Sequence, residues 1–528
     1  MREWKKRKRG FSVGRICHAS STFGEFYYLR VLLTKVKGPR SFDEIRTVDG
    51  VPYPTFREAR FAMGLLDDDK EYIFAIKEAS TWAPGQYLRR MFNALRLEAA
   101  RLIESLNEEQ LHIFNHVMSV LEHQTGGFFF VYGYGRTGKT FLWNALTSTL
   151  RSNGEIVLTV ASSGIAATLL PSGRTAHSRF AIPIHVHEYS MCSIKQNSPI
   201  SNLIEKMKLI IWDEAPMVQC YCIEAFDRTL KDIMHCSAPF GGKCIVMGGD
   251  FRQILPVIPK GNGHLGEAND GIAEIDIPLK LLISSYTNPI QAIVASTYPN
   301  LLENLHKNEY FNDRAILAPT IEHVYQVNDY MCSLLPGETF EFLSCDTVCR
   351  SDEDIDSFNN LYTTEFLNTI SCSGLPPHKL ILKVGAPIML LRNIDQSACL
   401  CNGTRMCISK LGKNVIEAII LSGSNPNQKV LLHRMDINPS ESRWPFRMKR
   451  RQFPITLSFA MTINKSQGQS LRSVGLFLTK PVFAHGQLYV ALSRVKSIDG
   501  LKIIIDADRK NMKSTTTNVV YKEIFRNL

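Results

Sequence analysis

The sequence predicts an α/β fold in which helices cover parallel sheets. In the first half of the chain, short β-branched and apolar runs alternate with segments of helical spacing, and this alternation returns in the second half. Strands that alternate with helices form parallel sheets, because each helical crossover covers a sheet face. Ligands of such sheets gather at the carboxyl ends of the strands. Residues that directly follow a strand are therefore the first candidates for a functional site.

The first α/β region is predicted in residues 101–262. Its strand-like segments are Phe128–Val131, Glu155–Ala161, Lys208–Trp212 and Lys243–Gly248. Helical spacing covers Gly138–Ser152, Gly164–Leu170 and Cys220–Met234.

A second α/β region is predicted in the other half of the chain. Its strand-like segments are Ala315–Ala318, Ser473–Leu478 and Leu501–Ile505, and Glu322–Leu334 has helical spacing. Between Gly385 and Pro454 the pattern changes to short apolar runs divided by turn residues such as Asn402-Gly403. This change predicts a small β-rich module inserted into the second region.

The strongest chemical signal is the segment 133–140, Gly-Tyr-Gly-Arg-Thr-Gly-Lys-Thr, which lies between a buried strand pattern and a helix. It is a complete phosphate-binding P-loop. Glycines let successive backbone N–H groups curl around phosphates, while the lysine reaches the outer phosphates and the last hydroxyl holds Mg²⁺. The predicted nucleotide-binding residues are Gly133, Gly135, Arg136, Thr137, Gly138, Lys139 and Thr140. Lys139 is also a predicted catalytic residue, and Thr140 a predicted ligand of Mg²⁺.

Two further strand ends carry residues suited to nucleotide hydrolysis. Asp213 and Glu214 directly follow the apolar run that ends at Trp212. We assign Asp213 to the Mg²⁺ water shell and Glu214 to the base that deprotonates the attacking water. Gln253 follows the strand-like segment that ends at Gly248. Its side chain is expected to detect the γ-phosphate.

Composition favours an intracellular protein that binds a polyanion. The net charge is +11 and the sequence pI is about 9.0, which favours nucleic acid as a partner. The 13 scattered cysteines indicate reduced thiols, with a zinc site as the alternative. The sequence contains no run of about 18 uncharged apolar residues, so neither membrane insertion nor secretion is expected.

Much of this positive charge lies in two basic clusters. Residues 5–9, Lys-Lys-Arg-Lys-Arg, predict a nuclear import signal, with a phosphate-binding arm or a solvated tail as alternatives. The expected location is the nucleus, with the mitochondrion as the alternative. The second cluster lies between Phe446 and Phe453, a composition suited to gripping a phosphate backbone beside stacked bases. It comprises Arg447, Lys449, Arg450 and Arg451, and a plain surface hairpin is the alternative.

Taken in order, the motifs resemble those of a known family. They are the segments 106–110, 133–140, 161–166, 213–217, 249–256, 315–320, 462–469 and 489–494. This series resembles superfamily 1B DNA helicases, and most closely the Pif-type (petite integration frequency) helicases. The preceding region, from Phe26 to Phe56, resembles the segment ahead of the helicase in Helitron transposon proteins of plants.

The resemblance implies an ATP-dependent helicase with two RecA-like P-loop domains and Mg²⁺ as the metal. Single-stranded DNA and duplex or forked DNA would be its partners, and movement would run from 5′ to 3′. Family roles in DNA repair, recombination and telomere maintenance follow from the resemblance alone.

The resemblance also implies roles for single residues. Gln110 would read the adenine edge, and Arg494 would be the arginine finger that neutralises charge on the γ-phosphate. Gly468 and Gln469 would bring the second domain to the nucleotide. The implied DNA contacts are Ser162, Ser163, His177, Lys465 and Ser466, with local capping or core packing as the alternative for these side chains.

By this resemblance the chain divides into five parts. They are a Helitron-like segment over 1–100, a first RecA-like domain over 101–262, a connector with the start of the second over 263–384, an SH3-like β insertion over 385–455, and the remainder of the second domain over 456–528.

One departure from the family pattern follows Gly261, where the chain passes directly to Asn262-Gly263-His264. Family members continue there through another helix and strand, with an arginine that contacts nucleotide, so a segment is expected to be missing. The alternative function is therefore a degenerate helicase remnant that binds ATP or DNA without unwinding. A third hypothesis, a P-loop kinase, conflicts with the paired Asp213-Glu214 and with Arg494.

Overall fold

The computed structural model describes most of the chain after residue 84 and short pieces before it. The described residues are 29, 32, 41–48, 51–56, 59, 85–123, 125–135, 137–255, 271–305, 307–348, 363–372, 374–395, 398–421, 426–439, 446–505 and 514–521. They belong to two compact units. One holds the residues up to Leu95 with Asn197–Asn202, and the other holds Arg96–Gln196 and Leu203–Leu528. Helices α5 (Gly85–Glu104) and α10 (Pro199–Lys206) have residues in both.

The described part of the smaller unit is a helix and a hairpin. Helix α2 (Phe42–Arg46) begins after Ser41, whose hydroxyl accepts a hydrogen bond from the Glu44 amide. Strands β1 (Thr47–Val48) and β2 (Val51–Pro52) then pair antiparallel. The Helitron-like segment lies only partly in this piece, and the basic run 5–9 lies outside the described residues.

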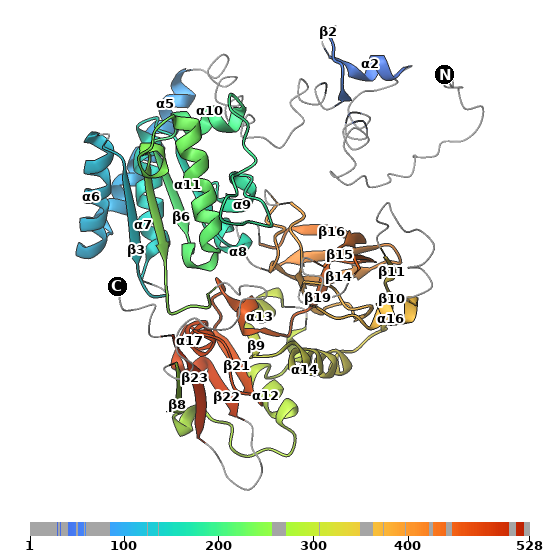
Figure 1. The fold of residues 1–528 in the computed structure, drawn as a ribbon. Helices are drawn as coiled ribbons and strands as arrows, with labels where there is room; N and C mark the ends of the chain where they lie inside the picture. Colours follow the sequence, from blue (N-terminus) through green and yellow to red (C-terminus); the bar gives the residue numbers. More distant parts are fainter. Residues whose placement is uncertain are drawn as a thin grey trace. The chain divides into compact units, whose positions relative to one another are not determined.

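The larger unit begins with a sheet in which all pairings are parallel, as the alternation of segments predicts. Its strand order is β3 (Gly127–Tyr132), β7 (Cys244–Gly249), β6 (Leu209–Asp213), β4 (Val157–Ala161) and β5 (Arg174–Thr175). The helices of this first lobe are α6 (Glu108–His123), α7 (Lys139–Ser152), α8 (Gly164–Thr168), α9 (Ala176–Arg179) and α11 (Cys220–Met234), and Figure 1 shows them around the sheet.

Burial explains why the central strands read as continuous apolar runs. Every residue of β4, β6 and β7 is buried, because helices cover the sheet. Gly248 of β7 is required by this packing, since a Cβ there would clash with the indole ring of Trp143 from α7. Trp143 is itself completely buried and fills the space between α7 and the sheet.

The second lobe of the larger unit repeats the parallel arrangement. Its sheet has the order β20 (Ala460–Thr462), β9 (Arg314–Ala318), β21 (Ser473–Leu478) and β22 (Leu501–Ile505). Its helices are α12 (Pro289–Thr297), α13 (Asn308–Asn312), α14 (Ile321–Leu334) and α17 (Gln487–Ser493). A separate antiparallel pair joins β8 (Ile272–Asp276) to β23 (Thr515–Val519). The predicted α/β class with two parallel sheets is therefore confirmed.

Between β9 and β20 the chain forms an antiparallel β-rich module. One sheet has the order β16 (Lys429–His433), β15 (Val415–Ile420), β14 (Arg405–Leu411), β13 (Pro387–Leu390) and β19 (Ile455–Leu457). Two smaller sheets pair β10 (Phe340–Leu343) with β12 (Lys379–Leu382), and β18 (Met448–Gln452) with β11 (Cys345–Val348) and β17 (Met435–Ile437). The β-rich region thus begins at Phe340, well before residue 385. Its SH3-like character stays a prediction.

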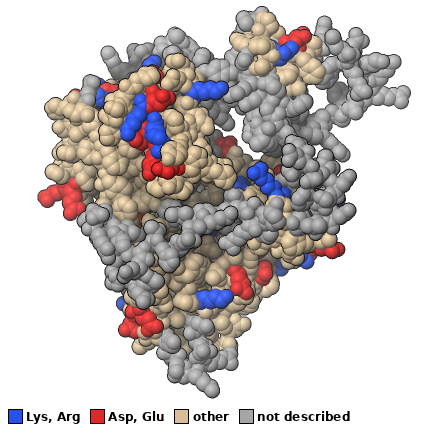
Figure 2. Space-filling view, in the orientation of Figure 1, with Lys and Arg blue, Asp and Glu red and all other residues tan. Residues whose placement is uncertain are grey.

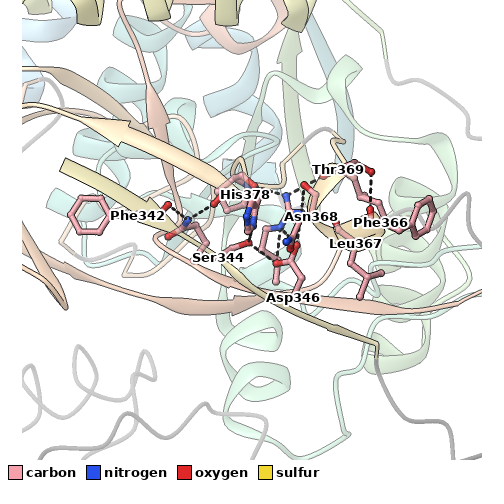
Figure 3. Close-up of polar contacts among 12 residues, drawn as sticks. Phe342, Ser344, Asp346, Phe366, Leu367, Asn368, Thr369 and His378 are labelled. Atoms are coloured by element: carbon pink, nitrogen blue, oxygen red, sulfur yellow. Dashed lines mark hydrogen bonds and ion pairs between the residues drawn. The ribbon is translucent and has the colours of Figure 1, made fainter. Parts of the chain in front are cut away.

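A buried ion pair holds part of this module together (Figure 3). Arg450 of β18 and Asp346 of β11 are almost completely buried, and the Arg450 Nη2 to Asp346 Oδ2 distance is 2.6 Å. Arg450 also donates to the carbonyl oxygens of Leu367, Ile370 and Pro376. The first two lie in or just after α16 (Thr364–Thr369), so this guanidinium joins the helix end to the sheet.

The same carboxylate is held from its other side. The Ser344 hydroxyl donates to Asp346 Oδ1 at 2.7 Å, and the Ser344 oxygen lies 2.7 Å from His378 Nδ1. An ionised carboxylate only accepts hydrogen bonds, so the serine proton points to Asp346 and the histidine donates to the serine oxygen. The buried Asp346 carboxylate thus has the Arg450 guanidinium on one side and the Ser344 hydroxyl on the other.

These contacts correct one interpretation of the second basic cluster. Arg450 is buried within the module and does not face a phosphate backbone, and Phe446 and Phe453 are buried with it. Lys449 and Arg451 both form ion pairs with Asp436. Along β18 the basic side chains alternate between the two faces of the sheet. The sequence pattern alone did not distinguish the buried Arg450 from its neighbours.

Elsewhere on the larger unit, charges of both signs are mixed. Figure 2 shows basic and acidic side chains next to one another over α11, where Arg228 pairs with Glu224 and Lys231 with Asp227. Among the described residues, no helix is long and apolar enough to cross a bilayer.

We predict that Arg450→Leu lowers the free energy of unfolding of the module by about 3–5 kcal/mol, because it leaves Asp346 charged, buried and unpaired. The matched control is Arg451→Leu, whose exposed ion pair with Asp436 should contribute at most about 1 kcal/mol. Urea denaturation of both variants measures the difference. Equal losses would show that the buried pair has no special role.

Candidate active site

The P-loop connects β3 to α7 and is anchored to the neighbouring strand. The Gly133 amide donates to the carbonyl oxygen of Gly249, at the end of β7, over 3.2 Å. Gly138 directly precedes α7 with a φ of 84°, a left-handed conformation that favours glycine. The loop therefore ends at the N-terminus of a 14-residue helix, where backbone N–H groups and the helix dipole favour an anion.

Gln110 of α6 reaches the P-loop from outside. Its Nε2 donates to the Thr137 carbonyl oxygen over 3.0 Å, and its Oε1 accepts from the Asn107 amide over 3.2 Å. A Cβ at Gly138 would lie 2.5 Å from Gln110 Nε2, so this close approach requires glycine. The structure thus places Gln110 against the backbone of the P-loop. Its predicted contact with an adenine edge stays a prediction.

Lys139 and Thr137 donate side-chain hydrogen bonds to backbone carbonyl groups of the P-loop. Lys139 Nζ donates to the carbonyl oxygens of Gly133 and Tyr134, over 2.5 and 3.0 Å. The Thr137 hydroxyl also donates to Tyr134 O, over 2.9 Å. Thr140 is the second residue of α7. Arg136, the remaining predicted residue of this loop, lies outside the described residues.

The acidic pair after β6 lies near Lys139 of the P-loop, with Asp213 buried and Glu214 half-buried. Burial raises the pKa of Asp213, while the Trp143 indole and the charge of Lys139 oppose that rise. By distance and angle, Asp213 Oδ1 is buried without a hydrogen-bond partner among the described residues, and the Trp143 Nε1 has none either. A buried acceptor without a donor, close enough to the P-loop lysine for its charge to be felt, fits a Mg²⁺ ion or its bound water.

Glu214 has an unusual backbone conformation and a raised pKa, and its role as catalytic base stays a prediction. Its φ of 52° is left-handed, a strained conformation for a residue with a side chain. Burial and the charge of Asp213 raise the pKa of Glu214 to about 7, against the lowering influence of Lys139, Arg494 and a hydrogen bond from Gln253. A carboxylate with a pKa near neutrality is suited to accept a proton.

The second lobe brings Arg494 to the same place. Its guanidinium donates to the carbonyl oxygens of Val490 and Gln469 and to the Ser493 hydroxyl. Arg494 is buried, and its Nη2 lies 4.0 Å from the position that a Cβ of Gly135 would occupy. The arginine from the end of α17 is therefore oriented toward the P-loop of the first lobe.

Gln253 is joined to the second lobe. Its Oε1 accepts a hydrogen bond from Gln467 Nε2 over 2.7 Å, and both side chains are buried. Gln467 lies between Ser466 and Gly468, and it joins the segment 465–469 to the first lobe. No role had been predicted for Gln467. Gly468 has a φ of 79° and would place a Cβ near Ile165 of α8.

Two more residues of the second lobe contact the loop 250–253, which follows β7. His485 Nε2 lies 2.8 Å from the Phe251 carbonyl oxygen, and the Tyr489 hydroxyl donates to Asp250 Oδ2 over 2.7 Å. Sequence reasoning missed both as site residues. Tyr489 opens a recognised motif, which was a usable signal, whereas nothing in the sequence marked His485.

The predicted DNA contacts are spread over both lobes, and most have local partners. The Ser162 hydroxyl accepts from the Trp212 indole, and the Ser163 hydroxyl caps α8 by accepting from the Ala166 amide. His177 lies against Cys222, and burial lowers its pKa. The capping and packing alternatives are thus present in the structure, and the DNA-binding roles stay predictions.

In the second lobe, Ser466 is buried and donates to Ile463 O, while Lys465 Nζ donates to Asn402 Oδ1 over 3.0 Å. Burial and the nearby charge of Arg392 lower the pKa of Lys465. Two cations held this close together are suited to a polyanionic ligand.

Two families match separate parts of this chain. Residues 105–266 match the family described as PIF1-like helicase, and residues 365–411 match the family described as DNA helicase Pif1, 2B domain. The first match contains the P-loop and the acidic pair. The second lies within the β-rich module and contains β12, β13 and β14.

Curated relatives cover much of the chain at low identity. The ATP-dependent DNA helicase PIF1 of Danio rerio is 27% identical over 444 residues, which cover 80% of this chain and 64% of that protein. Its namesake in Homo sapiens is 25% identical over 447 residues, covering 81% of this chain and 64% of that protein. The chain therefore spans less than two thirds of the length of these relatives.

Solved structures share the fold. A structure reported for DNA unwinding at forked dsDNA by two coordinating Pif1 helicases has a TM-score of 0.52 and 26% identity, covering 76% of this chain and 92% of that one. A crystal structure of Pif1 helicase from Bacteroides in complex with ADP-AlF3 and ssDNA has a TM-score of 0.51 and 23% identity, with the same coverage of 76% and 92%.

We predict that Gly486→Ala weakens the contact between the loop 250–253 and α17. Gly486 has a φ of 71°, and a Cβ there would clash with the carbonyl oxygen of Arg252. The control is Gly337→Ala, in the same lobe, where φ is 94° and a Cβ would have no neighbour within 4 Å. Both changes should cost about 1 kcal/mol through backbone strain, and Gly486→Ala a further 1–3 kcal/mol through overpacking. Thermal unfolding of both variants tests whether Gly486→Ala is the more destabilising change. Equal losses of stability would contradict the prediction.

Proposed function

Because this chain belongs to the PIF1-like helicase family, we propose that it is an ATP-dependent DNA helicase that couples Mg-ATP hydrolysis to movement along single-stranded DNA. One observation carries the proposal. Arg494 of the second lobe approaches the P-loop of the first, with its Nη2 4.0 Å from the position that a Cβ of Gly135 would occupy. Gln253 of the first lobe accepts a hydrogen bond from Gln467 of the second over 2.7 Å, and the charges of Lys139 and Arg494 both oppose the rise that burial causes in the pKa of Glu214.

Each group has a part in such a reaction. The P-loop amides and Lys139 would hold the phosphates, and Gln110 would keep the loop in place through the Thr137 carbonyl. Thr140 and Asp213 would hold Mg²⁺, which shields the phosphate charge when it is bound. Glu214 would accept the proton of the attacking water, and Arg494 would stabilise the charge that develops on the γ-phosphate.

The position of Arg494 gives a reason for coupling hydrolysis to motion. The lysine and the carboxylates belong to one lobe and the arginine to the other, so the catalytic set is complete only when the lobes are closed around the nucleotide. Opening after hydrolysis would shift the second lobe along a bound strand. Single-stranded DNA would lie near Ser162, Ser163 and His177 on one lobe and near Lys465 and Ser466 on the other.

The substrate and the direction follow the relatives. Solved neighbours are described with ssDNA and with forked dsDNA, so we propose single-stranded and forked DNA as the ligands of this chain. Movement from 5′ to 3′, roles in repair, recombination and telomere maintenance, and a nuclear or mitochondrial location belong to the same proposal.

The sequence also supports a second candidate, a helicase remnant that binds ATP or DNA without unwinding. It rests on the short passage after Gly261, which lies outside the described residues. Loss of an arginine that contacts nucleotide would weaken the stabilisation of the transition state, at a cost on the order of 10² or more in rate.

We predict that single-stranded DNA stimulates ATP hydrolysis by this chain. Glu214→Gln should lower kcat by about 10²–10⁴-fold while nucleotide binding persists, because only the proton acceptor is lost. Lys139→Ala should remove both binding and turnover, because the phosphates lose their charged partner. Steady-state ATPase assays with and without an oligonucleotide, combined with nucleotide-binding titrations, measure each effect. Binding without stimulated turnover in the unmodified chain would favour the remnant.

We predict a direction for unwinding as well. A duplex with a 5′ single-stranded tail should be separated in the presence of Mg-ATP, and the same duplex with only a 3′ tail should stay paired. A strand-displacement assay with both substrates compares them directly. Preference for the 3′ tail would reverse the proposed direction while leaving the ATPase proposal intact.

A further inference from the structure

One hydroxyl joins three parts of the candidate active site. Tyr489 of α17 donates to Asp250 Oδ2 over 2.7 Å, and its oxygen accepts a longer hydrogen bond, of 3.4 Å, from the Gly135 amide of the P-loop. Asp250 lies directly after β7, so the tyrosine touches a strand end and the P-loop of the first lobe from a helix of the second.

Asp250 gives Tyr489 a firm attachment. This carboxylate is almost completely buried, and its other oxygen accepts from the Arg252 amide over 3.0 Å. Each carboxylate oxygen thus has one donor, and Tyr489 supplies one of them. A hydrogen bond to a buried charged group is among the stronger ones in proteins.

The contact with Gly135 differs in kind. P-loop amides are the groups that bind phosphates, so a phosphate in the loop competes with the tyrosine oxygen for the Gly135 N–H. Of the three side-chain contacts between the lobes described above, those of His485 and Gln467 reach only the loop 250–253. Tyr489 is the one of the three that also reaches the P-loop.

The position of Tyr489 on α17 connects this competition to the arginine. Arg494 follows five residues later at the end of the same helix, and its Nη2 approaches the same glycine, Gly135. Tyr489 and Arg494 thus approach the same P-loop glycine from one helix.

We propose, on the basis of the proposed function, that Tyr489 is a positioning residue that links phosphate binding in the P-loop to the placement of Arg494. Its attachment to Asp250 holds α17 at the site, and its contact with Gly135 is exchanged for phosphate when nucleotide binds. Tyr489 acts through Arg494 and takes no part in the chemistry itself.

The test is Tyr489→Phe in the full chain, with Tyr310→Phe as the matched control. The Tyr310 hydroxyl donates to the Pro299 carbonyl at 2.8 Å in the second lobe, away from the P-loop. In Tyr489→Phe the Gly135 amide loses its competitor, so KM for ATP should fall about two- to tenfold. With α17 less firmly placed, kcat should fall about 10- to 100-fold. Tyr310→Phe should change neither constant.

A double variant separates positioning from a general loss of structure. If Tyr489 acts through Arg494, Tyr489→Phe combined with Arg494→Ala should have the kcat of Arg494→Ala alone. If the two changes lower kcat independently, so that their effects multiply, the inference is wrong. A rise in KM for ATP on Tyr489→Phe would also overturn it.

Binding of a non-hydrolysable ATP analogue distinguishes this inference from the proposed function. Tighter binding by Tyr489→Phe than by the unmodified chain supports the exchange at Gly135 even if the unmodified chain hydrolyses no ATP. Unchanged or weaker binding overturns it, whether or not single-stranded DNA stimulates hydrolysis.

Discussion

Parallel pairing of β3, β7 and β6 is the constraint on which the rest of the active site depends. The register sets Tyr132 beside Gly249, and Trp212 beside Met247, so the three strands end at one edge of the sheet. The P-loop, the acidic pair and the loop 250–253 each leave from one of these ends. Because every residue of β6 and β7 is buried, a slip in their register would disrupt the packing of their apolar side chains, and this cost holds the catalytic groups in place.

The second lobe contributes to the site through contacts made mainly to the loop 250–253. Gln467, His485 and Tyr489 each meet a different residue of that loop, and Gly486 allows the two backbones to approach closely. These contacts are single hydrogen bonds between the lobes, unlike the buried ion pair of Arg450 and Asp346 in the β-rich module. A buried charge pair thus joins parts of the module, while hydrogen bonds join the lobes.

Periodicity closely predicted the strands and helices that it named in each lobe, since buried strands and amphipathic helices leave distinct patterns. Short elements such as β5, β20 and α13 were not predicted. Periodicity also could not place charges that alternate along one strand. Arg450 and Arg451 are neighbours in a basic run, yet one is buried against Asp346 and the other pairs with the exposed Asp436, because successive residues of a strand face opposite sides. The start of the β-rich module at Phe340 was missed for a related reason, since β10 pairs with β12 across a long stretch of sequence.

The sequence by itself determined the chemistry that is available: a P-loop with Lys139, a carboxylate pair at a strand end, and Arg494 in a distant motif. Local spacing is sufficient for this, because a P-loop binds phosphate through its own backbone and lysine. Only the tertiary structure decided which groups meet. Burial and the adjacent Asp213 raise the pKa of Glu214 to about 7, while Lys139, Arg494 and Gln253, all more than 30 residues away in sequence, oppose that rise. Tyr489 reaches Gly135 from the other lobe. Such contacts depend on how two sheets are placed against each other, and no local pattern records that placement.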